Sequence, residues 1–387
     1  DHTMNHENPI YPKQLKVAFA GGGINSAVGR AHRIAIELDQ RFKLVAGCFS
    51  QNTAENSASA EAYGIPAERT YASIDKLVEA EINSVDAVVI ITPTPNHVTD
   101  VMCCLGKNVP VICEKALATS SRDIRGIKDA VATHKGFLAV TYNYAGYPML
   151  RELRRMIGDG AMGRVEQIHI EMPQEGFVKR NADGEPNKPQ EWRLHDDSVP
   201  TLSLDLGVHL HHIIDFLSGE KPIRLVATQN RFGAFGEVVD NAICIAQYTN
   251  SMVCNIWYSK AALGHRNGLR VRVYGSAGSA EWYQADPEHL HVADNQGCRR
   301  ILDRSANEMQ ICSQERYTRF KAGHPAGYIE AFANLYWDIA DALEQYASAQ
   351  ESSNNPYVDG VDKALEGLLM LEAIAASAQE GKWIDLA

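Results

Sequence analysis

Asp205 and His209 are the first pair of residues in this sequence whose types and spacing could support chemistry. They are four positions apart, so on a helix both side chains would lie on one face. A carboxylate beside an imidazole suits a general base and the group that orients it. The same residues also fit a helix with a polar face that packs through Leu206 and Leu210, so the spacing alone leaves both interpretations open.

Lys115 is a second candidate for chemistry. It follows the apolar run Val109–Cys113, which predicts a buried strand. A lysine at the carboxyl end of a parallel strand points into the crevice where ligands bind in open α/β sheets. The alternative is a surface lysine paired with Glu114. Its position at the strand end favours the ligand crevice.

Three consecutive glycines mark a third site. The apolar run Lys16–Ala20 leads into Gly21-Gly22-Gly23, and apolar residues then recur at helical spacing. Glycines between a strand and a helix allow backbone N–H groups to approach a pyrophosphate at the helix N-terminus. The spacing departs from G-x-G-x-x-G, with Ser26 or Gly29 at the third position. The context predicts dinucleotide binding, and a glycine turn without a ligand is the alternative.

The end of the second predicted strand bears on the choice of cofactor. NAD-binding folds usually place an Asp or Glu there for the adenosine ribose. Residues 47–52 contain no carboxylate and no arginine. Ser50 and Asn52 could hydrogen-bond the ribose of either cofactor, so the sequence permits NAD or NADP.

The pattern of residues 1–144 predicts a domain that could position these sites. Apolar strand-like runs alternate with amphipathic helical segments, with strands near 16–20, 44–49, 85–91, 109–113 and 137–142. The run Val85–Ile91 is almost wholly apolar, as in a strand that is buried on both faces. Repeated βα units with short connections predict a doubly wound parallel sheet, that is, an α/β Rossmann domain.

Residues 145–387 follow a different rhythm, which predicts an α+β domain with a large, mostly antiparallel open sheet. Helices are expected near 148–157, 201–217, 327–346 and 360–378, and strands near 164–171, 224–232, 241–248, 252–259, 269–274 and 280–282. The helix 360–378 could pack back on the first domain.

Composition excludes several function classes. The net charge of −11 without clustered Lys and Arg argues against nucleic-acid binding. No apolar run is long enough for a membrane span and no export signal is recognised, so we expect no membrane partner. Eight cysteines without C-x-x-C pairs favour reduced thiols and a cytoplasmic location. His209, His211, His212 and Asp215 lack a metal-binding motif, so no metal is expected.

Several segments together resemble a known family. They are the glycine loop, Val111–Lys115, Glu191–Arg193, Asp205–His209 and the ending Ser377–Leu386. The combination is similar to the family of glucose–fructose oxidoreductase and inositol dehydrogenase, the Gfo/Idh/MocA family. The resemblance covers essentially the whole chain. It implies hydride transfer between NAD or NADP and a secondary hydroxyl of a sugar, cyclitol or sugar derivative.

The resemblance assigns roles to individual residues. It implies that Lys115, Asp205 and His209 are catalytic, with His209 taking the hydroxyl proton, and that the same three residues bind substrate together with Trp192 and Arg193. The implied cofactor contacts are Gly21, Gly22, Gly23, Ile24, Asn25, Ser50, Asn52, Thr92, Pro93, Asn96, His97, Glu114, Lys115 and Asn143.

The sequence departs from the family pattern at three places. Ala116 stands where a proline usually follows the lysine, and His212 stands where an aspartate is usual. The segment 198–204 lacks the glycines that usually precede the aspartate. These changes put in question the backbone shape after Lys115 and the shape of the sugar pocket.

Three functional possibilities stay open. The first is a dehydrogenase, the second a cofactor-binding sensor without turnover, and the third an enzyme that retains and internally recycles its cofactor. The presence of Lys115, Asp205 and His209 together favours an enzyme, because a sensor needs only the glycine loop. The resemblance also implies a homodimer or homotetramer through the open sheet, where apolar surface is expected from Ile243, Ile245, Val253, Ile256 and Trp257.

Overall fold

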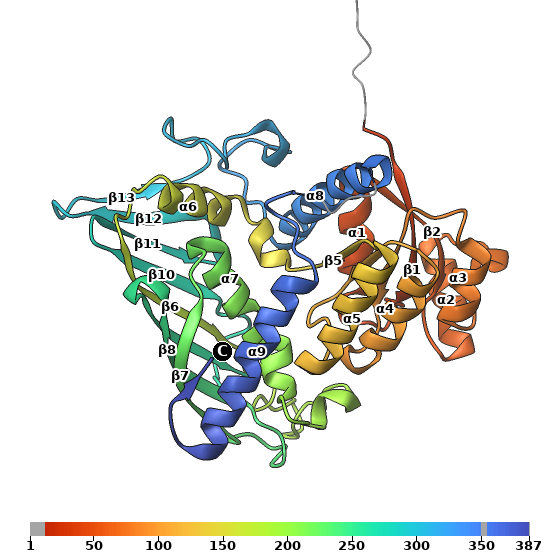
Figure 1. The fold of residues 1–387 in the computed structure, drawn as a ribbon, viewed down its shortest axis with the longest axis horizontal. Helices are drawn as coiled ribbons and strands as arrows, with labels where there is room; N and C mark the ends of the chain where they lie inside the picture. Colours follow the sequence, from red (N-terminus) through yellow and green to blue (C-terminus); the bar gives the residue numbers. More distant parts are fainter. Residues whose placement is uncertain (1–11, 350–353, 387) are drawn as a thin grey trace, which may run out of the picture.

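A computed structural model describes residues 12–349 and 354–386 and shows two sheets side by side (Figure 1). The first eleven residues of the predicted first domain, and residues 350–353 and 387 of the second, lie outside the described part. The first sheet is parallel, with the order β2-β1-β3-β4-β5. Its strands are β1 (Leu15–Gly21), β2 (Phe42–Cys48), β3 (Ala87–Ile91), β4 (Val111–Cys113) and β5 (Leu138–Val140). The order reverses between β1 and β3, which creates the crevice where such sheets bind ligands.

Helices connect these strands in the expected alternation. They are α1 (Gly29–Leu38), α2 (Thr53–Tyr63), α3 (Ile74–Glu81), α4 (His97–Gly106) and α5 (Ser121–His134). Side-chain oxygens of Asn52, Ser73 and Ser120 accept from backbone N–H groups in the first turns of α2, α3 and α5. These caps satisfy N–H groups that a helix start otherwise leaves unpaired. The α/β prediction for this half is confirmed.

The second sheet has the order β13-β12-β11-β10-β6-β9-β8-β7-β14. Among its described strands only β6 and β9 pair in parallel, so the sheet is mostly antiparallel as predicted. The strands are β6 (Val165–Pro173), β7 (Pro222–Asn230), β8 (Asn241–Tyr248), β9 (Val253–Ser259), β10 (Arg270–Gly275), β11 (Gly278–Tyr283), β12 (Asp286–Asp294), β13 (Arg299–Leu302) and β14 (Ile384–Asp385).

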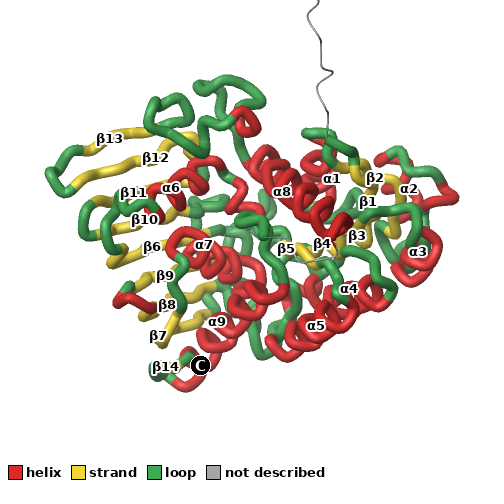
Figure 2. Tube along the Cα trace, turned by 45° about the horizontal axis from the view of Figure 1, so that its top comes forward, coloured by secondary structure: helices red, strands yellow, loops and turns green. Residues whose placement is uncertain are grey.

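One face of this sheet is covered and the other is open. Helices α6 (Pro148–Gly158), α7 (Val208–Ser218) and α9 (Val361–Glu380) lie between the sheet and the first domain (Figures 1 and 2). On the open face Ile243, Ile245 and Val253 are exposed. Ile256 was expected on that face, but it is buried, because side chains alternate along β9 and Ile256 points to the helices.

The two long C-terminal helices join the halves of the molecule. Helix α8 (Tyr328–Ala349) contributes Phe332, Tyr336 and Ile339 to the same apolar core as Phe19 of β1. Helix α9 packs against β7 of the second sheet and also against α5, where Glu372 accepts from the backbone N–H of Ser121. Helix α8 belongs to the second half of the sequence but packs on the core of the first sheet. The predicted domain boundary at 144/145 therefore stays a prediction.

Some elements were not expected from the sequence. Helix α2 has no apolar stripe, and β12 and β13 form a charged hairpin around Gly297. The predicted helix 201–217 is interrupted, because Ser203–Gly207 forms a π-helical turn before α7. Across the described residues, none of the helices combines the length and apolar character needed to cross a bilayer.

Candidate functional site

A cleft of about 640 Å³ opens at the carboxyl ends of β1, β2, β3 and β4. It brings together most of the residues predicted to bind cofactor or substrate. Those that line it are Gly21, Gly22, Gly23, Asn25, Ser50, Thr92, Pro93, Asn96, His97, Glu114, Lys115, Trp192, Arg193 and Asp205. Ile24, Asn52, Asn143 and His209 are not among the residues that line it.

The glycine loop has the shape that a pyrophosphate needs. Gly21 has φ +80°, and a Cβ there would lie 2.7 Å from the backbone nitrogen of Thr92. A Cβ on Gly29 would overlap the carbonyl oxygen of Gly22, so Gly29 is the glycine that lets α1 approach the loop. Ser26 instead accepts from the N–H of Gly29.

The start of α1 also fits an anion. Its first turn contains no acidic side chain, and its N-cap residue, Val28, has no side-chain cap. Among the described residues, no protein acceptor is found for the backbone N–H groups of Gly23 and Asn25. Donors without protein partners in the glycine loop that leads into a helix N-terminus provide a site for a phosphate group. The residues present therefore fit a dinucleotide.

The sequence predicted no carboxylate for the cofactor ribose at the end of β2, and the structure differs from that prediction. Ser50 lines the cleft, whereas Asn52 uses its side chain to cap α2 by accepting from Glu55 N. Glu55 itself turns into the lining of the cleft from the first turn of α2. A carboxylate is therefore present after all, but it comes from a helix that the sequence analysis did not predict.

His97 forms hydrogen bonds to the backbone at the ends of both β3 and β4. Its Nδ1 lies 2.6 Å from the carbonyl oxygen of Ala116, and its Nε2 lies 2.8 Å from that of Thr92. The Lys115–Ala116 peptide is cis, although Ala116 replaces the proline that the family usually has there. His97 thus lines the cleft mainly as a support for its two edges.

Glu114 connects the cleft to the buried interior. One carboxylate oxygen accepts from the backbone N–H of Lys115 at 3.0 Å, and the other lies 2.5 Å from Nε2 of His32 on α1. The opposite ring nitrogen of His32 contacts the hydroxyl of Tyr336 on α8. Burial opposes ionisation of Glu114, but His32 and Lys115 outweigh it and lower its pKa. These contacts, from Tyr336 through His32 and Glu114 to the backbone N–H of Lys115, hold the peptide of Lys115 in place.

Asp205 is the centre of the charged part of the site. Its carboxylate lies 3.0 Å from Lys115 Nζ, 2.5 Å from Arg193 Nη1 and 2.6 Å from Lys260 Nζ. Burial favours its neutral form, but the attraction of Lys260, Lys115 and Arg193 holds the Asp205 pKa well below its usual range. Asp205 is therefore ionised, as its predicted role requires. Lys260, at the end of β9, was missed by sequence reasoning.

The π-helical turn positions both Asp205 and its backbone. Lys115 Nζ donates to the Asp205 carbonyl oxygen at 2.8 Å as well as to the carboxylate. Such turns interrupt the regular i to i−4 hydrogen bonds and are frequent at functional sites. We expected Asp205 and His209 to lie on one face of a regular α-helix. Instead Asp205 lies in the π-helical turn and His209 in α7.

His209 lies beside the Asp205 group at the start of α7. Its ring meets Tyr144 edge-on, with centroids 4.5 Å apart. Burial, and next the charge of Lys115, lower the His209 pKa well below its usual range, so the imidazole is neutral at neutral pH. Among the described residues it has no hydrogen bond to Asp205, so the predicted base–carboxylate pair is not in direct contact.

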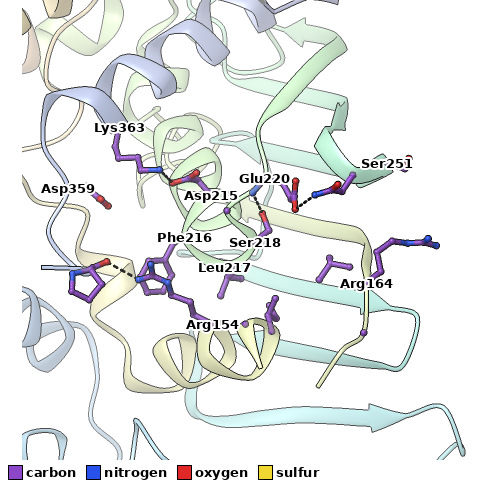
Figure 3. Close-up of a pocket in the computed structure, with 17 residues that line it drawn as sticks. Arg154, Arg164, Asp215, Phe216, Leu217, Ser218, Glu220, Ser251, Asp359 and Lys363 are labelled. Atoms are coloured by element: carbon purple, nitrogen blue, oxygen red, sulfur yellow. Dashed lines mark hydrogen bonds and ion pairs between the residues drawn. The ribbon is translucent and has the colours of Figure 1, made fainter. Parts of the chain in front are cut away.

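His212, the other departure, pairs with a carboxylate from elsewhere. Its Nε2 lies 2.6 Å from Asp359 Oδ2, and Tyr142 stacks on its ring. Asp359 also borders a second cavity of about 790 Å³ behind α7, where Lys363 points to Asp215 (Figure 3). Within the part of the chain that is described, no group of three or more His, Cys, Asp or Glu side chains is arranged to hold a metal ion.

Known proteins share this architecture. Residues 15–142 match the oxidoreductase family with an NAD-binding Rossmann fold, and residues 150–281 match the C-terminal domain of the GFO/IDH/MocA family. An uncharacterised oxidoreductase, YfiI of Bacillus subtilis, is 30% identical over 97% of this chain and 98% of its own. Inositol 2-dehydrogenase of Rhizobium meliloti is 25% identical over 93% and 96%.

A solved structure agrees with these relatives. The inositol dehydrogenase homologue of Azotobacter vinelandii, crystallised with NADH and myo-inositol, superimposes with a TM-score of 0.86 at 26% identity, covering 96% of this chain and 98% of that one. The chain is therefore a member of the GFO/IDH/MocA family of oxidoreductases, with an NAD-binding Rossmann fold.

Proposed function

We propose that the protein is an NAD-dependent dehydrogenase that oxidises a secondary hydroxyl of a sugar, cyclitol or sugar derivative. The contact of Lys115 with Asp205 carries this proposal, because it joins the cofactor cleft of the first domain to the second domain. Relatives named for inositol and levoglucosan oxidation support the substrate class.

The side chains divide the work of such an oxidation. Neutral His209 accepts the proton of the substrate hydroxyl, as its lowered pKa allows. Lys115 donates to the substrate oxygen and is held by Asp205, while Trp192 and Arg193 border the substrate. A nicotinamide cofactor held by the glycine loop supplies the acceptor for the hydride.

The assay that tests this function measures NADH formation. Purified protein is mixed with NAD⁺ or NADP⁺ and a panel of hexoses, inositols and nucleotide sugars. Lys115→Ala should abolish the signal, because it removes the donor at the substrate oxygen. Lys107→Ala, on the exposed end of α4, is the matched control and should retain it. Equal activity of Lys115→Ala and wild type would contradict the assignment.

Glu55 supports NAD over NADP. Glu55, from the first turn of α2 after β2, lines the cleft, Asp75 adds a second carboxylate from the first turn of α3, and the two cations of the lining, Lys115 and Arg193, come from other segments. A 2′-phosphate carries negative charge and would be repelled by these carboxylates, whereas a ribose hydroxyl can donate to them.

Glu55→Gln should therefore improve the use of NADP⁺ relative to NAD⁺ by about tenfold, which corresponds to roughly 1.4 kcal/mol of removed repulsion. The ratio of kcat/KM for the two cofactors measures this change. Glu61→Gln is the control, because it makes the same change on the exposed side of α2 away from the cleft. An unchanged ratio in Glu55→Gln would assign cofactor choice to other residues.

We also propose a homodimer or homotetramer, formed through the open face of the second sheet. Exposed Ile243, Ile245 and Val253 form an apolar strip on β8 and β9 that none of the described helices covers (Figures 1 and 2). Burial of this strip would stabilise an interface. Light scattering at micromolar concentration should give a dimer or tetramer mass, and a monomer would remove the idea.

A cytoplasmic location is the remaining part of the proposal. All eight cysteines of the chain are free thiols, and several are buried in the two cores. Free thiols are typical of proteins that work in a reducing compartment.

A further inference from the structure

Lys260 contacts the Asp205 carboxylate but has no task in the proposed oxidation. Its Nζ lies 2.6 Å from Oδ2 of Asp205, an oxygen that also accepts from Arg193 Nη1 at 2.5 Å. The other carboxylate oxygen, Oδ1, lies 3.0 Å from Lys115 Nζ. Lys260 and Arg193 therefore hold one oxygen of the carboxylate, and Lys115 meets the other.

The sheet of the second domain holds Lys260 in place. Lys260 directly follows β9, which pairs with β6 on one side and with β8 on the other. Its N–H donates to the Asp240 carbonyl oxygen at 2.8 Å, and its own carbonyl oxygen accepts from the N–H of Phe177 at 2.9 Å. The side chain is only 7% exposed and is not among the described residues that line the cleft. Lys260 therefore reaches Asp205 from within the second domain.

Arg193 holds the same oxygen from a different kind of element. It belongs to the short 3₁₀ turn Glu191–Leu194 in the long connection after β6, and it lines the cleft. Connecting segments generally move more than strands, and a precise geometry is better held by a rigid element. Lys260 is thus the fixed partner of Asp205 Oδ2, whereas Arg193 is the partner within reach of a ligand.

The orientation of Asp205 sets the direction of the Lys115 ammonium group, which has three N–H donors. One donates to the Asp205 carbonyl oxygen at 2.8 Å, and another donates to Oδ1 at 3.0 Å. The third is left for the substrate oxygen, as the proposed oxidation requires. A rotation of the carboxylate would remove the contact with Oδ1 and turn the third N–H away from that oxygen.

We propose that Lys260 is a positioning residue, which fixes the Asp205 carboxylate so that Oδ1 holds Lys115 with one N–H directed at the reacting hydroxyl. Lys260 acts through Asp205 and touches neither substrate nor cofactor. The inference rests on the proposed dehydrogenase function and adds a residue to its machinery. Because correct orientation of reacting groups lowers the barrier of the chemical step, Lys260 should act on kcat.

Lys260→Met removes the charge and fills a similar space. It should lower kcat for the substrate found in the panel by about 10- to 100-fold, the loss that a misplacement of reacting groups can cause. The Kd of NADH and the KM of the alcohol should stay within about twofold of wild type, because Lys260 does not line the cleft. Lys260→Arg keeps the charge at Oδ2 and should recover most of kcat.

Lys363→Met is the matched control. Lys363 Nζ lies 2.8 Å from Oδ2 of the buried Asp215, and both residues line the second cavity behind α7 instead of the cleft (Figure 3). The variant thus also takes a cation from a buried carboxylate, but outside the cleft. It should retain kcat, even where it lowers the thermal midpoint as much as Lys260→Met does.

The pH profile separates positioning from a general loss of stability. Burial raises the Asp205 pKa, and the attraction of Lys260 is the strongest of the opposing effects that hold it low, followed by Lys115 and Arg193. Three further titratable groups face Asp205, namely His209, Tyr144 and Tyr328. Without Lys260 the Asp205 pKa rises, so the carboxylate gains a proton at higher pH and releases Lys115. The acid-side fall of kcat should therefore lie at higher pH in Lys260→Met than in wild type or in the control.

A crystal structure of Lys260→Met tests the geometry directly, because Asp205 Oδ1 should no longer lie within hydrogen-bond distance of Lys115 Nζ. Wild-type kcat in Lys260→Met, an equal loss of kcat in Lys363→Met, or an unchanged contact of Lys115 with Asp205 overturns the inference. If Lys260→Met fails to fold, Lys260→Gln, which keeps a donor but no charge, is measured in the same way. If wild type oxidises none of the panel, the proposed function fails, and the crystal structure alone decides whether Lys260 orients Asp205.

Discussion

His209→Gln should lower kcat for alcohol oxidation by about 10² to 10⁴-fold while NADH binding is unchanged. The imidazole is buried and neutral and, unlike that of His97, makes no hydrogen bond among the described residues, and loss of a general base typically costs this much. Glutamine fills a similar volume and keeps a polar end beside Tyr144, but it cannot take up a proton at neutral pH. Steady-state kinetics with any substrate found in the assay measures the loss.

The matched control for this variant is His211→Gln. His211 lies on the same helix, is also buried, and has a pKa lowered to about 4 by burial. It lies against Gly367 of α9, whereas His209 lies against Tyr144 and feels the charges of Lys115 and Asp205. His211→Gln should retain kcat, although it can lower the thermal midpoint. Equal losses of kcat in both variants would indicate a general effect of α7 packing and would contradict a role for His209 as base.

The pH profile gives a further check on the same residue. His209 must be neutral to accept a proton, so oxidation is lost only when pH falls below its lowered pKa. Since that pKa lies well below 6.5 and Asp205 is ionised throughout, kcat/KM for oxidation should stay flat as pH falls through 6.5. A break near 6.5 that disappears in His209→Gln would show that the imidazole is more exposed to water in solution than its burial indicates.

The sequence predicts the scaffold well because the scaffold depends on local patterns. The β-branched run of β3 and the polar caps Ser73 and Ser120 are local signals, and the structure follows them. Helix α2 was missed because it consists mostly of Ala, Ser, Asn and Glu and therefore has no apolar stripe. It is defined instead by its Asn52 cap and by burial of Tyr63 against Phe19 and Phe49 of the first core.

The charged parts of the site depend on contacts that local patterns do not contain. Lys260 is 55 residues from Asp205, and His32 is 82 residues from Glu114. Lys260 follows an apolar strand much as Lys115 does, and that similarity is the signal that could have singled it out. The π-helical turn at Asp205 has no recognised sequence signal, yet it decides how Asp205 meets Lys115.

A substitution of Gly29 is expected to have a large effect on cofactor binding. Gly29→Ala should weaken NADH binding roughly 5- to 150-fold, which corresponds to the roughly 1–3 kcal/mol that overpacking typically costs. A Cβ at this position would overlap the carbonyl oxygen of Gly22, so α1 must move away from the loop whose N–H groups are to hold the pyrophosphate. Fluorescence titration with NADH measures the change, and circular dichroism establishes that the variant is folded.

Gly126→Ala is the control for the same substitution in a helix. Gly126 lies within α5, and a Cβ there would meet no atom within 4 Å. Alanine at this position should leave NADH binding unchanged and raise stability by roughly 0.5–1 kcal/mol, because it removes backbone freedom from the unfolded chain. If Gly29→Ala instead binds NADH as tightly as Gly126→Ala does, the close approach of α1 to the glycine loop does not determine cofactor affinity. Retention of the fold with loss of binding in Gly29→Ala alone would locate the pyrophosphate at this helix terminus.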